Sequence, residues 1–225
     1  MKKFDLEDEI TLPTMQKSTY YSVPLGFKHE FYLSGTIEEP EKYAEWLHLI
    51  RNASENDEII IHINSQGGNA ATAIQLMRVL KETPATVTAS VEGVCMSAAT
   101  FIFLSATAFD ISEFSDFMFH NYSSITSGKG GEMFDAISHE KKWADNLMKT
   151  IYKDFLTENE IQQILDNRDI WMEGDEVMER LKKRNEIFIE KMKAEETEKA
   201  VQVCQDAGLE VDKEAKPKRK KNDKI

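Results

Sequence analysis

Hydrophobic positions along the chain follow two patterns that alternate with each other. A short, almost unbroken β-branched run at residues 58–63 predicts a strand buried on both faces of a sheet. Apolar residues that recur every three or four positions over residues 40–53 predict a helix with one buried side. Strands that alternate with helices favour an α/β fold with a mainly parallel sheet and right-handed crossovers. The other predicted strands are 29–35, 85–92, 108–111 and 117–120, and the other predicted helices are 69–82, 97–104, 132–156 and the stretch from residue 173 onward.

The predicted helix at residues 132–156 has an apolar stripe along one side. Such a side must be buried, either on the chain's own sheet or against another subunit. Its members are Met133, Ile137, Leu147, Ile151 and Phe155, with Trp143 and Met148 beside them. Thr157 follows, with Glu160 three residues later, which is the spacing of a capping box. This spacing predicts that a new helix begins after Thr157.

The 225 residues suit one domain with a sizeable core. Residues 1–27 show no sustained period and contain two prolines, which predicts an extended or loosely ordered N-terminal arm. We expect the domain to span residues 28–185. Residues 186–225 are predicted to be a charged tail, helical at first and disordered after about residue 207.

The net charge of −12 is unevenly distributed. Residues 212–225 hold seven Lys/Arg and three Asp/Glu, a balance of +4, so the remainder carries −16. An acidic body argues against binding to nucleic acid. The basic run is either a solvated end or a contact for an acidic partner.

The sequence also restricts the compartment. Two cysteines, Cys95 and Cys204, supply no disulfide framework, which is typical of a reducing compartment. No apolar run approaches the roughly 18 residues of a membrane helix. Acidic residues stand near the start, where a signal peptide needs an apolar core. We therefore expect an intracellular, cytoplasmic protein without a membrane partner.

A serine follows one predicted strand, and a histidine ends another. Ser97 lies where the strand at 85–92 has ended and a helix begins, so its hydroxyl can project beside free N–H groups. A serine hydroxyl needs an adjacent base to become a nucleophile, and His120 ends the strand Phe117-Met118-Phe119. Taken alone, Ser97 also fits a tightly packed helix start, and a histidine at a strand end is often merely exposed.

A carboxylate must orient such a histidine. Asp169 lies between Arg168 and an apolar triplet, although a salt bridge with Arg168 explains it equally well. Asp166 is a rival on local grounds. The histidines and cysteines lack the spacing of metal ligands, so we expect neither a metal site nor a cofactor.

Two adjacent glycines follow the strand at 58–63. Gly67-Gly68 allows the backbone to approach another group closely, which suits either a simple turn before a helix or one N–H of an oxyanion hole. It matches neither a dinucleotide-binding fingerprint nor a P-loop.

These segments together resemble the ClpP-type serine peptidase family over about residues 28–180. The family's Ile-Asn-Ser-Pro-Gly-Gly is similar to residues 63–68, its Gly-x-Ala-Ala-Ser-Met/Ala to 93–98, its Met-Ile-His-Gln-Pro to 118–122, and its Arg-Asp-x-x-Met/Leu to 168–172. The resemblance implies a crotonase-like α/β spiral with a handle helix, with residues 123–156 at the position of the handle.

The resemblance also implies an activity, which is endopeptidase cleavage by a Ser-His-Asp triad inside a chamber of stacked heptameric rings. It makes Ser97 the nucleophile, His120 the base and Asp169 the orienting carboxylate, with the Gly68 and Ala98 amides as oxyanion donors. It assigns the protein or peptide substrate to a further set of residues: Gly67, Asn69, Ser124, Ile125 and Thr126.

The chain departs from the family pattern in three places. The stretch before Phe31 lacks the usual N-terminal helical pattern, Asn121-Tyr122 follows the histidine, and charged residues replace the usual sequence after Met172. An AAA+ unfoldase partner is therefore in doubt. Such divergence resembles phage-encoded members, some of which mature capsids, so viral capsid assembly proteins are alternative partners in the cytoplasm of a host.

A ring-forming assembly component without activity is the non-enzymatic alternative. Acyl-CoA chemistry of the crotonase type would need no such triad.

Overall fold

The computed structural model describes the chain from residue 25 to residue 206 and its side chains as far as residue 199. Most of the predicted arm at 1–27 and the disorder predicted after residue 207 lie outside the described residues. The elements in chain order are β1 (Lys28–Ile37), η1 (Pro40–Tyr43), α1 (Ala44–Asn52), β2 (Glu58–Gly68), α2 (Ala70–Glu82), β3 (Thr86–Met96), α3 (Ala99–Phe103), β4 (Ala108–Ile111), β5 (Asp116–Phe119), α4 (Gly130–Tyr152), α5 (Glu158–Leu165), β6 (Ile170–Glu173) and α6 (Gly174–Asp206).

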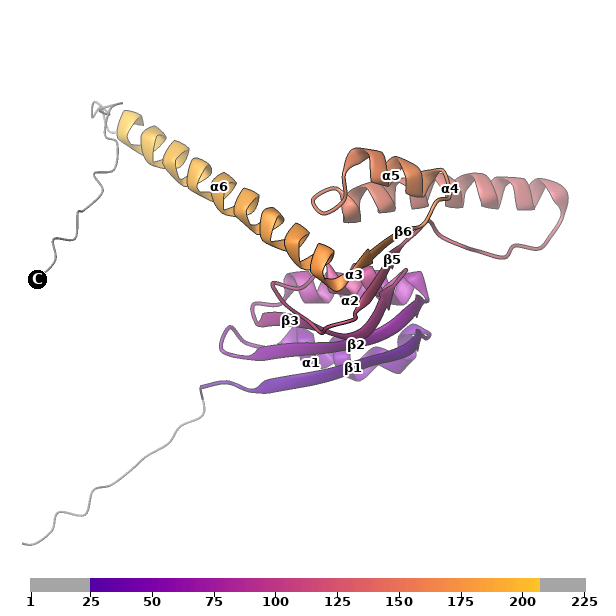
Figure 1. The fold of residues 1–225 in the computed structure, drawn as a ribbon, viewed down its shortest axis with the longest axis horizontal. Coiled ribbons are helices and arrows are strands. Elements are labelled where there is room, and N and C mark those ends of the chain that lie inside the picture. Colours follow the sequence, from indigo (N-terminus) through magenta and orange to yellow (C-terminus); the bar gives the residue numbers. More distant parts are fainter. Residues whose placement is uncertain (1–24, 207–225) are drawn as a thin grey trace, which may run out of the picture.

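One sheet contains all six strands (Figure 1). Its order is β1-β2-β3-β5-β6, with β4 also beside β3, and every pairing is parallel except β5 with β6. The predicted α/β fold with a mainly parallel sheet is thus confirmed. The long strand β3 pairs with β4 along residues 88–91 and with β5 along residues 94–96. Because β5 joins the final third of β3, the residues that follow these two strands lie next to each other.

The strand β2 is buried on one face. Ile59, Ile61 and Ile63 are at most 2 % exposed, whereas Ile60 and His62 between them are half-buried. The prediction that this run is buried on both faces is therefore wrong for the single chain. The reason is that α1, α2 and α3 pack together on one side of the strands (Figure 1).

The long helix α4 is divided into two halves by its contacts. Ala144, Met148 and Tyr152 in its C-terminal half are buried, and Leu147 and Ile151 pack against the chain's own core. The N-terminal half instead leaves Phe134 and Ile137 exposed, and Trp143, just past the middle of the helix, is exposed as well. The predicted stripe is therefore not one surface for another subunit, because its C-terminal part is already covered by this chain.

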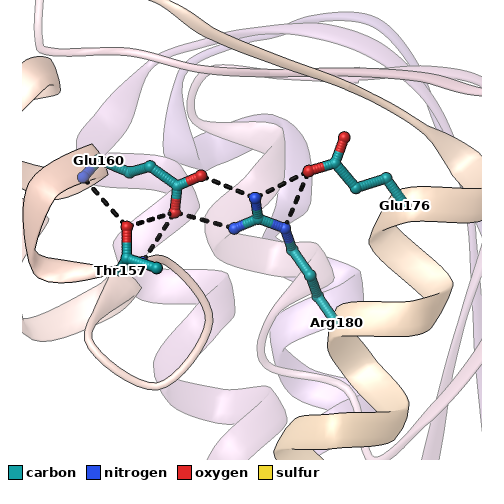
Figure 2. Close-up of polar contacts among 4 residues, drawn as sticks. All are labelled: Thr157, Glu160, Glu176 and Arg180. Atoms are coloured by element: carbon teal, nitrogen blue, oxygen red, sulfur yellow. Dashed lines mark hydrogen bonds and ion pairs between the residues drawn. The ribbon is translucent and has the colours of Figure 1, made fainter.

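A polar bracket joins α5 to the first turns of α6 (Figure 2). Thr157 and Glu160 form the predicted capping box at the start of α5. The two Glu160 carboxylate oxygens accept from Arg180 Nη1 and Nη2 at 2.9 and 2.7 Å, and Arg180 also donates to Glu176. The arginine thereby lowers the pKa of Glu160 to about 2. The bracket closes a loop that contains β6, a strand that the sequence patterns do not predict.

The burial of apolar side chains in α6 changes along the helix. Val177 and Leu181 are buried against the core, whereas Phe188 and Met192 are exposed. The helix runs through the domain boundary expected at residues 185/186 without a break and leads away from the sheet (Figure 1).

Candidate active site

Ser97 lies immediately after β3, where the chain turns sharply into α3. Its φ of 54° falls in the left-handed region, which a residue other than glycine seldom occupies. Its backbone N–H donates to the Met118 carbonyl of β5 at 2.8 Å. The parallel pairing of β3 with β5 therefore extends as far as Ser97 and fixes the backbone from which its hydroxyl projects.

The structure brings His120 to Ser97. His120 follows β5 directly, and its Nε2 lies 2.6 Å from Ser97 Oγ. Both side chains are half-buried. When Nε2 carries no proton, the serine hydroxyl donates to it, which is the geometry that activates a serine.

Two opposing influences act on the histidine. Burial lowers the pKa of His120 from its ordinary value of 6.5, and the negative charge of Asp169 acts in the opposite direction. The net effect is a lowered pKa, so the ring is neutral near neutral pH. A neutral ring is what a general base requires.

Asp169 is placed by the antiparallel pairing of β5 with β6. Phe119 pairs with Ile170, so the next positions along the two strands are His120 and Asp169. Residues opposite each other in such a ladder share a face of the sheet. Asp166 instead caps the end of α5, where it accepts from Gln162. Within residues 25–199, neither a hydrogen bond from His120 to Asp169 nor an ion pair of Asp169 with Arg168 is formed.

A side-chain bond that sequence reasoning missed joins the histidine and aspartate segments. Asn121 Nδ2 donates to Asn167 Oδ1 at 3.1 Å, and Asn121 Oδ1 accepts from the Tyr122 N–H. Asn121 is 8 % exposed, and Asn167 has a φ of 63°. An asparagine next to His120 and another two residues before Asp169 were visible in the sequence, but their pairing depends on the fold.

The double glycine lies against the serine turn. A Cβ on Gly67 would stand 2.6 Å from Ser97 Cβ and 3.0 Å from the Ala98 nitrogen, so only glycine fits there. The Gly67 N–H donates to Ser65 Oγ at 3.1 Å, and Gly68 pairs with Ile37 of β1. In the described part of the chain, the Ala98 N–H meets no acceptor.

The remaining predicted substrate residues fall into two groups. Asn69 caps α2 through Thr72 and contacts Glu39, so its side chain is already engaged. Ser124, Ile125 and Thr126 are exposed in a segment without regular structure, and the Ser124 hydroxyl donates to Glu140 of α4 at 2.7 Å.

Other site types are not found in the described residues. No cluster of three or more potential metal-ligating side chains occurs among them. None of the helices formed by residues 25–206 has the length and apolarity needed to cross a membrane.

A serine hydroxyl that lies 2.6 Å from a histidine nitrogen has the geometry of a nucleophile beside its base. The family model described as Clp protease matches residues 31–203, more than three quarters of the chain, and the chain belongs to this family. It is thus a ClpP-like peptidase by descent, and members of the family form oligomeric rings.

One solved structure supports the same fold. An aspartate-for-asparagine mutant of ClpP1 from Listeria monocytogenes has 22 % sequence identity and a TM-score of 0.57, with 68 % of this chain and 86 % of that chain covered. The chain therefore has the ClpP fold. No curated protein matches the sequence.

Proposed function

We propose that the protein is a serine endopeptidase in which Ser97 attacks a peptide carbonyl and His120 takes its proton. The 2.6 Å contact between Ser97 Oγ and His120 Nε2, in a member of the Clp protease family, is the observation that carries this proposal. His120 then gives the proton to the leaving amine, and a water molecule repeats the sequence to release the acyl group. The negative charge of Asp169 favours the charged form of the imidazole, and we propose that in the working form its carboxylate accepts from the imidazole N–H and so holds the required tautomer.

The proposed oxyanion donors are the N–H groups of Ala98 and Gly68. The Ala98 N–H is free of acceptors in the described chain, and Gly67 holds the turn close to Ser97, with its own N–H occupied by Ser65. An oxyanion hole stabilises the charge that develops on the carbonyl oxygen. The exposed segment Ser124–Thr126 is the proposed contact for an extended peptide, because a segment outside any ladder can pair with a peptide main chain. Gly67, which lies against Ser97, is the other proposed contact.

The proposed working form is a ring assembly with its sites facing an internal chamber. Family membership supports a homo-oligomer, and stacked heptameric rings are the specific form proposed. A chamber would protect folded proteins from a peptidase that recognises mainly the peptide backbone. The partner that delivers the substrate, an AAA+ unfoldase or a capsid assembly protein, is a question for binding experiments.

Covalent labelling tests the proposal directly. The full chain is treated with a fluorophosphonate–rhodamine probe, and the adduct is located by mass spectrometry. We expect one adduct, on Ser97, which Ser97→Ala abolishes while Ser34→Ala, an exposed serine of β1, leaves it unchanged. Peptidase activity should fall with the label by a factor on the order of 10⁴–10⁶. An assembled parent protein that takes up no label would instead be the inactive ring component.

A narrower form of the same proposal is maturation of viral capsids. The replacement of the usual residues after the histidine by Asn121-Tyr122, together with an α6 of 33 residues, favours a specialised member of the family. Cleavage of one capsid precursor but not of labelled casein would support this form, and the reverse result would support general proteolysis.

A further inference from the structure

A chain of two hydrogen bonds, made by two buried side chains, connects α4 to the serine turn. The Tyr152 hydroxyl lies 2.8 Å from Thr100 Oγ1, and Thr100 Oγ1 donates to the Ser97 carbonyl oxygen at 2.6 Å. Both Tyr152 and Thr100 are 0 % exposed. The contact joins residues 52 positions apart, so it is a product of the tertiary fold.

The direction of each bond follows from the number of protons. A threonine hydroxyl has one proton, and a carbonyl oxygen can only accept, so the Thr100 proton points to Ser97. Thr100 must then accept the proton of Tyr152. Burial raises the pKa of the Tyr152 hydroxyl, which keeps it a donor at every relevant pH.

These bonds fix the orientation of the peptide unit between Ser97 and Ala98. The Ser97 carbonyl accepts from both Thr100 Oγ1 and, at 3.0 Å, the Thr100 N–H. In a trans peptide the carbonyl and the following N–H point in opposite directions. Because the carbonyl is held toward α3, the Ala98 N–H is directed away from it, and Ser97 stays in its left-handed conformation.

We propose that Tyr152 and Thr100 are positioning residues that couple the packing of α4 to the orientation of the Ala98 N–H and the Ser97 hydroxyl. This inference rests on the proposed peptidase function. The Tyr152 ring packs edge-on against Phe101 and Phe119, with centroids 6.0 and 5.5 Å away, and this packing needs no hydroxyl. The hydroxyl therefore has a role separate from filling the core.

A variant that lacks only the Tyr152 hydroxyl tests its positioning role, because the packing of the ring in the core is kept. For Tyr152→Phe we expect the maximal rate of fluorophosphonate labelling to fall about tenfold, at an unchanged half-saturating probe concentration, because reacting groups lose alignment. Thr100→Val should lower this rate further, whereas Thr100→Ser keeps the hydroxyl and should restore the parent rate. The matched control is Tyr43→Phe, since the buried Tyr43 hydroxyl accepts from the Glu38 N–H and has no path to the site.

The thermal unfolding midpoint of each variant is measured alongside the labelling rate. Slower labelling in Tyr152→Phe and Thr100→Val, but not in Thr100→Ser or Tyr43→Phe, supports the proposal. Parent rates in Tyr152→Phe and Thr100→Val overturn it, as does a loss that Tyr43→Phe shares. Should Tyr152→Phe fail to fold, the contrast between Thr100→Val and Thr100→Ser decides. Full activity of Ser97→Ala would overturn the proposed function itself, whatever the Tyr152 variants do.

Discussion

Ser97 and His120 follow strands inside the sheet, whereas Asp169 precedes a four-residue strand at its edge. The first two are half-buried and joined to each other by a short hydrogen bond, and the Ser97 backbone is bonded to β5. Asp169 is exposed and acts on His120 through its charge. The two sides of the candidate site are thus held by different means.

Different elements of the fold therefore determine the positions of the serine and histidine on one side and of the aspartate on the other. The parallel ladder between β3 and β5 fixes the serine and the histidine, as backbone bonds do throughout the sheet. The aspartate depends on the short antiparallel ladder, the Asn121–Asn167 bond and the bracket at Glu160. We therefore expect changes around Asp169 to have graded effects on activity while the fold persists.

The largest effect should come from the carboxylate itself. We expect Asp169→Asn to reduce kcat by roughly 10⁴, because an amide favours the wrong histidine tautomer. Asp166→Asn is the matched control and should be mild, since Asp166 caps α5. Peptide hydrolysis and fluorophosphonate labelling measure both. The reverse ranking would make Asp166 the orienting residue.

The same variant should change the pH dependence of the reaction. The base must be neutral, and the pKa of His120 is already below 6.5, so labelling should lose rate only below that pH. The carboxylate of Asp169 raises this pKa, so its removal should move the acidic limb to still lower pH. The labelling rate across pH 4–8 measures the shift, and an unmoved limb would show that Asp169 does not influence His120.

The two halves of α4 also differ, because the C-terminal half packs against the core of this chain and the N-terminal half is exposed. We expect Leu147→Glu to destabilise the fold by roughly 2–4 kcal/mol, because it places a charge against the core. Ile137 is 48 % exposed, so Ile137→Glu should leave the unfolding midpoint nearly unchanged and weaken assembly instead. Light scattering and thermal unfolding separate the two outcomes. An intact assembly of Ile137→Glu would place the subunit contact elsewhere.

The asparagine bond should have a smaller effect than the carboxylate it supports. Asn167→Gly keeps the positive φ without strain and removes only the side chain, and Asn121→Ala removes the donor. We expect each to lower kcat/KM by about tenfold, as a misplaced catalytic group does. The double variant should be no worse than either single one, because both remove the same bond. Additive losses would mean that the two residues act independently.

The smallest effect should come from the bracket of Figure 2. Glu160→Gln should lower stability by about 1 kcal/mol, since the pair is partly exposed and screened by solvent. The folded pKa of about 2 lies below the ordinary 4.5, so this stabilisation is present above pH 4.5 and is lost as the pH falls toward 2. Urea unfolding at pH 3 and pH 7 should therefore show a smaller difference between the variant and the parent at pH 3. An equal difference at both values would contradict the lowered pKa.

The sequence by itself determined the local structure and the chemistry-bearing segments. Hydrophobic periodicity identified the main strands and helices, because burial of apolar faces imposes these periods on the sequence. The capping box at Thr157 and Glu160 was predicted because it needs only residues within one turn. The motifs around Ser97 and His120 were similarly local, and each marks the end of a strand.

Only the tertiary structure decided the contacts between distant segments. The exposed face of β2, the strand β6 and the two halves of α4 depend on what packs against them, which periodicity cannot specify. Asp166 and Asp169 are equivalent by local criteria, and only the register of β5 with β6 sets Asp169 opposite His120. The bonds of Tyr152 and Asn121 were likewise invisible, because a hydrogen bond across 52 or 46 residues leaves no local pattern.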